Sequence, residues 1–154
     1  MSRSNRVVQV LLVAVAAGVV FSACNGPLPF LSGGRLDGTV KPTPTTWAFA
    51  EDFAVIQLET RPAAPYSVNI AYTQLDGSLY IYAGDTETEW VKHMNEDPRV
   101  RFRLGDDLYE LQAERVTDGD EIAAFAEAWV SHSSIHRDPM ELETRWLYRL
   151  KGRS

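Results

Sequence analysis

The sequence predicts a small, mainly β domain (α+β class): an antiparallel barrel of six to seven strands with two helices. Three observations support this fold class. Apolar and polar residues alternate in several short runs after residue 45, as they do in half-buried strands. Asp76-Gly77 and Gly105-Asp106-Asp107 join neighbouring runs as hairpin turns. Two further segments carry apolar residues at helical spacing. Many short strands joined by hairpins favour an antiparallel barrel.

Four strands are expected in the first half of this domain. The third of them places Val68, Ile70 and Tyr72 on one face. Asp76-Gly77 follows it as a two-residue turn, in which both residues take positive φ. The expected strands span residues 45–50, 53–60, 67–75 and 79–83.

A first helix is expected at residues 86–95. Thr86 and Glu89 fit a capping box, and Trp90 lies on the same helix face as Met94, four residues later. Pro98 cannot continue a helix, so the helix ends before it.

The second half contains a hairpin, a helix and a closing strand. The hairpin strands are expected at residues 100–104 and 108–116, and the last strand is expected at residues 145–150. Between them, residues 118–129 form a second helix. Its apolar stripe consists of Ile122, Phe125, Ala126 and Trp129.

Residues 1–23 have the layout of a secretion signal. Two arginines precede an uncharged apolar run at residues 7–20, which is shorter than the roughly 20 residues that a membrane-spanning helix needs. Ser and Ala then stand directly before Cys24, as in the bacterial lipobox, in which the cysteine is acylated and becomes the first residue. The sequence predicts a lipoprotein anchored at Cys24. An uncleaved anchor and a general signal peptide are the alternatives.

The rest of the chain agrees with an anchored extracytoplasmic domain. Residues 24–44 are rich in Gly and Pro and are expected to form a flexible tether to the domain at residues 45–154. Cys24 is the only cysteine, so no disulfide holds the fold together. Removing residues 1–23 takes away two arginines and no acid, and the formal charge of −6 becomes −8. An acidic domain is a poor electrostatic partner for nucleic acid and for anionic lipid surfaces. The acyl chains on Cys24 are therefore expected to supply the contact with the membrane. The expected location is the cell envelope, on the extracytoplasmic face of either membrane.

Residues 90–100 read Trp-Val-Lys-His-Met-Asn-Glu-Asp-Pro-Arg-Val and lie between the two hairpins. This segment resembles the W-x-x-N-L-x-x-N/D-P-x-V segment of the flavin-binding split-barrel proteins, the pyridoxamine-phosphate-oxidase-like group. Within that group, the Trp eight residues before the Pro is most similar to the deazaflavin-dependent nitroreductase branch. Residues 58–68 resemble the strand, basic turn and second strand of the same family. The resemblance implies a split β-barrel over residues 50–150.

The resemblance also implies a cofactor and its site. In the family, the basic turn holds the cofactor phosphate, and the next strand passes along the ring. FMN or a deazaflavin is the expected cofactor, in a cleft at a subunit interface, so a homodimer is compatible with the sequence. The residues that the resemblance assigns to the cofactor are Thr60, Arg61, Tyr66, Ser67, Val68, Tyr82, Trp90 and Lys92.

Two functions remain open at this point. The first is a flavin- or deazaflavin-dependent oxidoreductase that passes a hydride to a quinone-like or nitro-aromatic acceptor. Flavin enzymes often need no catalytic side chain, and none can be assigned here. The second is a cofactor-free lipoprotein that uses the barrel cleft for a small ligand or pairs with another protein. His132 and His136 have the spacing of a two-histidine metal site, but the sequence shows no third ligand, so no metal is expected.

Overall fold

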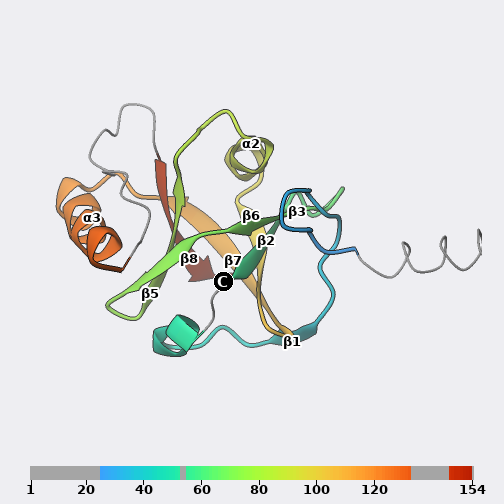
Figure 1. Ribbon diagram of the computed structural model, residues 1–154, viewed down its shortest axis with the longest axis horizontal. Coiled ribbons are helices and arrows are strands. Elements are labelled where there is room, and N and C mark those ends of the chain that lie inside the picture. The colour runs from blue at the N-terminus through green and yellow to red at the C-terminus, as the bar shows by residue number, and fades with distance from the viewer. Residues whose placement is uncertain (1–24, 53–54, 133–145, 154) are drawn as a thin grey trace, which may run out of the picture.

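The computed structural model describes residues 25–52, 55–132 and 146–153. The predicted signal segment, Cys24, His136 and the side chain of His132 lie outside this description. The described chain forms a curled sheet, seven strands of which run in the order β3-β2-β6-β7-β8-β5-β4 with antiparallel pairing. Two α-helices pack outside the curl (Figure 1). The predicted fold class, a mainly β half-barrel with two helices, is confirmed.

The strands and helices follow each other along the chain with short connections. The first half contains β1 (Thr39–Lys41), a 3-10 helix η1 (Ala48–Asp52), β2 (Ile56–Thr60), β3 (Tyr66–Ile70), β4 (Tyr72–Leu75) and β5 (Ser78–Ala83). The second half contains α2 (Glu89–Glu96), β6 (Arg99–Leu104), β7 (Asp107–Arg115), α3 (Gly119–His132) and β8 (Trp146–Gly152). Both predicted hairpins and the closing strand are confirmed.

The prediction of one strand at residues 67–75 is wrong, because the chain breaks at Ala71. The part before the break is β3, which pairs with β2, and the part after it is β4, which pairs with β5. These two strands lie at opposite ends of the strand order. One continuous strand cannot pair at both edges, so the backbone has to break where the curled sheet brings its edges together. The alternation of apolar and polar residues continues through the break and hides it in the sequence.

The strand predicted at residues 45–50 is also wrong, because η1 replaces it. Trp47 is buried, with the edge of its ring against Phe102 and Tyr109. The Ala50 N–H bonds to the Trp47 carbonyl, so the backbone closes a local turn instead of pairing with a strand. Trp47 thus belongs to the barrel core without being part of a strand.

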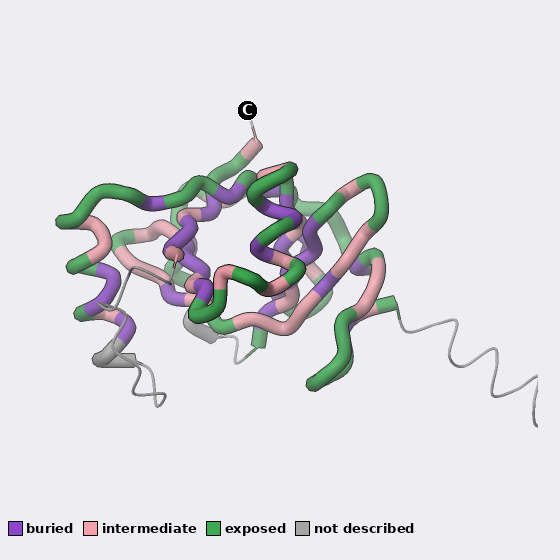
Figure 2. The backbone as a smooth tube through the Cα atoms, turned by 90° about the horizontal axis from the view of Figure 1, so that it is seen from above, coloured by how far each residue is buried: buried purple, intermediate pink, exposed green. Residues whose placement is uncertain are grey.

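Two apolar clusters hold the elements together. The larger one fills the barrel, and the smaller one lies between α3 and the sheet. Figure 2 shows in purple which backbone positions carry buried residues. Strand β5 contributes to both because its side chains alternate: Leu79 and Ile81 belong to the barrel core, whereas Tyr80 packs with Phe125 of α3. α3 begins after Asp118, whose side chain accepts a hydrogen bond from the Glu121 N–H.

α2 begins three residues later than predicted. Its N-cap is Thr88, which makes no side-chain capping bond, so the predicted capping box of Thr86 and Glu89 is wrong. The Asp85 carboxylate accepts the Glu87 N–H and turns the chain before the helix starts. Neither of the α-helices within the described residues has the length and apolar character that crossing a bilayer requires.

Candidate functional site

The turn between β2 and β3 carries the predicted phosphate-binding residue. Arg61 has a φ of 53°, and its Nε donates to the Ala64 carbonyl at 2.7 Å, so the side chain lies over its own turn. Positive φ is uncommon for a residue with a Cβ, and it is often found at functional turns. Arg61 is exposed, and among the described residues no acid forms an ion pair with it. The guanidinium is thus free to bind an anion.

Below this turn, Thr60, Tyr66 and His93 form a small polar cluster. Thr60 Oγ1 lies 3.3 Å from the Tyr66 carbonyl and 3.2 Å from His93 Nδ1. A hydroxyl has one hydrogen. If it is donated to the carbonyl, His93 must carry its proton on Nδ1 and donate it to Thr60. The His93 ring also packs against the Tyr66 ring edge, with 5.1 Å between centroids.

His93 is held neutral near pH 7. Burial lowers its pKa, because the charged imidazolium loses water, and the nearby Arg61 cation lowers it further. Glu89 and Glu96 act in the opposite direction without reversing the shift. A neutral imidazole leaves Arg61 as the local positive charge of this cluster.

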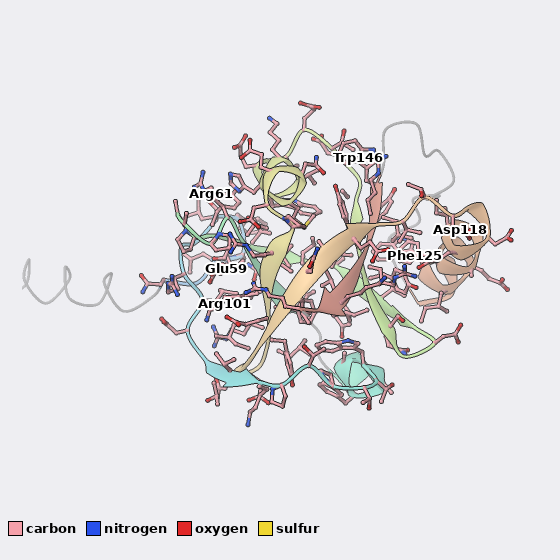
Figure 3. The ribbon with its side chains drawn as sticks, turned by 180° about the vertical axis from the view of Figure 1, so that it is seen from behind. Glu59, Arg61, Arg101, Asp118, Phe125 and Trp146 are labelled. Atoms are coloured by element: carbon pink, nitrogen blue, oxygen red, sulfur yellow. The ribbon has the colours of Figure 1, made fainter. Side chains whose placement is uncertain are left out.

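The outer face of the sheet next to the turn is polar and covered by the chain's own N-terminal segment, residues 25–36. Gly33 and Ser67 exchange two backbone hydrogen bonds of 2.9 Å. The Leu36 N–H donates to the Glu59 carboxylate at 2.5 Å. Glu59 is buried and also pairs with Arg101 at 3.1 Å. In Figure 3, Glu59, Arg61 and Arg101 lie on the same side of the barrel.

Parts of residues 24–44, which we expected to form a flexible tether, contact the barrel. Leu36 is 1% exposed, and β1 pairs with β7. The described part of the segment therefore contacts the barrel at these points, although most of its residues are exposed.

A groove of about 290 Å³ lies where the N-terminal segment meets β3. Its walls are residues 28–32 on one side and Tyr66, Val68 and Asn69 on the other. A larger groove of about 440 Å³ lies elsewhere, between residues 43–47 and the end of β8. The basic side chains there, Arg149 and Lys151, are paired with Glu114. The groove beside β3 is therefore the better candidate site.

The structure brings together some of the predicted cofactor residues and separates others. Thr60, Arg61, Tyr66, Ser67 and Val68 all lie at the β2–β3 turn and on β3. Lys92, on α2, lies 3.4 Å from Glu89 and 3.9 Å from Glu87, so its charge is compensated.

Trp90 and Tyr82 have packing roles. Trp90 is partly buried against the barrel core. Tyr82 lies under α3, with its ring 5.6 Å from that of Trp129. α3, where Figure 3 labels Phe125, is on the opposite side of the barrel from Arg61. Tyr82 does not belong to the cluster around Arg61.

Three residues of the site could not be assigned from the sequence. His93 comes 33 residues after Thr60, and nothing in the local pattern links the two. Glu59 follows an apolar residue in a strand and resembles any solvated strand residue. Gly33 lies in a Gly-rich segment that predicts a loop. Among the described residues, no group of three or more His, Cys, Asp or Glu is arranged to hold a metal ion.

The residues fit a flavin at its phosphate end and only in part along its ring. Arg61 is a cation at a turn with no ion-pair partner in the described part of the chain, and Tyr66 and Val68 of the following strand line the groove. The Ser67 Oγ is buried without a hydrogen-bond partner among the described residues. The resemblance assigned the ring to backbone groups of this strand, but Gly33 already uses the Ser67 N–H and carbonyl.

No family model matches the sequence, and no curated protein matches it significantly. Solved structures do share its fold. A conserved hypothetical protein of Mycobacterium tuberculosis is 20% identical with a TM-score of 0.52, over 74% of this chain and 86% of that one. A Listeria innocua protein assigned as a pyridoxamine 5′-phosphate oxidase is 14% identical with a TM-score of 0.52, over 70% and 90%. An FAD-binding protein of Mesorhizobium loti is 19% identical with a TM-score of 0.50, over 71% and 90%. The chain therefore shares its split-barrel fold with these three proteins.

Proposed function

We propose that this chain is a lipid-anchored split-barrel domain that binds a flavin or deazaflavin and serves as an oxidoreductase. The observation that carries the proposal is Arg61 at the β2–β3 turn, which has no ion-pair partner among the described residues and precedes the strand that lines the groove. The same fold occurs in a protein named for FAD binding and in one assigned as a pyridoxamine 5′-phosphate oxidase.

The chain's own residues would bind and orient the cofactor. Arg61 would hold the phosphate, since guanidinium groups bind phosphate through charge-assisted hydrogen bonds. Tyr66 and Val68 would form the apolar wall of the groove. When bound, a flavin or deazaflavin supplies hydride transfer. A quinone-like or nitro-aromatic acceptor is the substrate class that we propose. Neutral His93 keeps Tyr66 in place through Thr60.

Anchoring is the other part of the proposal. The lipobox-like residues before Cys24 predict acylation at that sulfur and a location in the cell envelope. Intact-mass measurement of the mature protein tests this directly. A mass that starts at Cys24 and includes acyl chains supports the anchor, and an unmodified Cys24 contradicts it.

The cofactor test uses the mature protein purified from membranes. Its visible spectrum is recorded, and it is titrated with FMN and with a deazaflavin. We expect binding that Arg61→Ala weakens by about ten- to a hundredfold, the effect of losing a hydrogen bond to a charged group. Lys41→Ala is the control, because Lys41 lies on β1 and pairs with Asp107. No visible band and no binding at high micromolar concentrations would contradict the proposal.

A second candidate, a cofactor-free binding module, is favoured by two specific observations. The Gly33–Ser67 pairing and the compensated Lys92 leave less room and less charge for a flavin than the resemblance implies. In this case the groove along β3 would take a small apolar ligand. The same titration distinguishes the two candidates, because a folded protein that binds neither FMN nor a deazaflavin supports the second one.

A further inference from the structure

Three large apolar side chains crowd the tip of one turn in the N-terminal segment. Leu28 is 52% exposed, Phe30 is 97% exposed and Leu31 is 65% exposed. The Leu31 N–H bonds to the Leu28 carbonyl at 3.2 Å and closes the turn. Single exposed apolar residues are ordinary, but three within four residues form a patch of the kind that marks a contact surface. We call residues 28–31 the apolar turn.

The apolar turn is held in a fixed position on the barrel. The Asn69 side chain donates to the Leu28 carbonyl at 2.9 Å. Further along the segment, Gly33 pairs with Ser67, and the Gly34 N–H donates to the Asn25 carbonyl at 2.7 Å. Both ends of the segment are therefore fastened, and Phe30 projects from it into solvent.

The position of the proposed anchor identifies what covers this turn. Cys24 immediately precedes Asn25, whose carbonyl is bonded within the segment. Leu28 comes four positions after Cys24, a span of at most about 14 Å. A lipid on Cys24 thus holds the apolar turn within reach of the bilayer surface, whatever the orientation of the barrel.

We propose that the apolar turn inserts into the interfacial region of the membrane and fixes the orientation of the barrel. This inference rests on the lipid anchor proposed above. Burial of Leu28, Phe30 and Leu31 in lipid removes their apolar surface from water, and aromatic and aliphatic side chains are what interfacial segments bury. An acidic domain gains little from charged headgroups, so the contact is apolar and does not require anionic lipid. The groove along β3 then opens near the membrane surface, because the apolar turn forms one of its walls.

The test places an environment-sensitive NBD label at position 30 of the full lipidated protein. Phe30→Cys supplies the only free thiol, because Cys24 is the only cysteine and its sulfur carries the lipid. Val40→Cys is the matched control, an apolar β1 residue that is 58% exposed. In phosphatidylcholine vesicles we expect a blue shift and strong quenching by brominated lipid at position 30, and a water-like emission at position 40.

Three outcomes would overturn the inference. A water-like label at position 30 in protein that still floats with the vesicles leaves the anchor intact and removes the insertion. A blue shift that brominated lipid does not quench, and that grows with protein concentration, assigns the turn to a protein partner or a second copy. If the protein carries no acyl mass on Cys24 and does not float with vesicles, the lipid anchor is contradicted. The proposed insertion, which rests on the anchor, is then contradicted as well.

Discussion

Burial and the nearby Arg61 cation both lower the pKa of His93, and this shift makes the free energy of unfolding depend on pH. Burial first, and the Arg61 cation second, lower the pKa of His93 in the folded protein. The unfolded chain therefore binds a proton at a higher pH than the folded chain does. The stability contribution of His93 is fully present above its unfolded pKa of about 6.5 and is lost as the pH falls below that value.

Replacement of His93 should reduce this dependence on pH. Wild-type protein should lose stability between pH 7.5 and pH 5.5, and His93→Asn should lose less over the same interval, although it starts from a lower value. Urea unfolding at both pH values measures the difference. The lowered pKa of Asp97, about 2, belongs to a lower pH range and does not interfere. Equal slopes for the two proteins would show that His93 is not the group that titrates.

Glu59 and Arg101 form a buried ion pair that also fastens the N-terminal segment. Glu59→Gln removes the charge that compensates Arg101 and weakens the bond from the Leu36 N–H. We expect a loss of about 3–5 kcal/mol, the usual result of leaving one partner of a buried pair. Glu110→Gln is the control, because Glu110 is half exposed and lies 3.7 Å from Arg153. It should change the free energy of unfolding by about 1 kcal/mol or less. Chemical denaturation measures both, and similar small losses would refute the assigned role.

Residues close in sequence could be grouped into a site, and residues far apart could not. Arg61 and Tyr66 lie at the two ends of one turn, so the basic turn and the strand after it could be predicted from the sequence. The contact of Thr60 with His93 depends on how α2 packs over the end of β2, which is set by the whole barrel core. Tyr82 is a similar case: the structure places it under α3, away from Arg61. Alternation in the sequence places Tyr82 on one face of its strand but does not predict which helix covers that face.

The elements that were predicted well are those with local determinants. Asp76 and Gly77 have φ values of 49° and 75°, as a two-residue hairpin turn requires. The break at Ala71 and the 3-10 helix after Trp47 have no such local signal. The pairing of β3 and β4 with different strands explains the break, and the packing of Trp47 against Phe102 and Tyr109 accompanies the 3-10 helix.

The two α-helices differ in how they begin, and this difference predicts a difference in stability. The Asp118 side chain caps α3, whereas Thr88 makes no side-chain cap for α2. Asp118→Ala should cost about 1 kcal/mol, and Thr88→Ala should cost only a few tenths. Thermal or urea unfolding of the two variants checks this. A Thr88→Ala loss as large as that of Asp118→Ala would contradict the assigned caps.

At the scale of the whole molecule, the N-terminal segment connects the proposed anchor with the candidate site. The sequence predicted the split barrel and an anchor at Cys24, but it described residues 24–44 as a tether. A high content of Gly and Pro predicts that a segment has little helix or strand. It does not predict that the segment lacks contacts with the rest of the domain. Residues 25–36 in fact follow the outer face of β2 and β3 and form a wall of the groove. Among the described residues, the groove lies between this segment and β3, the strand that follows the turn at Arg61.

Hydrogen exchange of the mature lipidated protein, with and without FMN or a deazaflavin, tests the central claim most directly. We expect a cofactor to slow exchange in peptides covering residues 60–70 and 28–36, because the proposed site lies between the β2–β3 turn and the N-terminal segment. Peptides covering residues 43–47 and 149–152, at the larger groove, should not change. Protection confined to the larger groove, or no protection at saturating cofactor, would contradict a flavin site at Arg61.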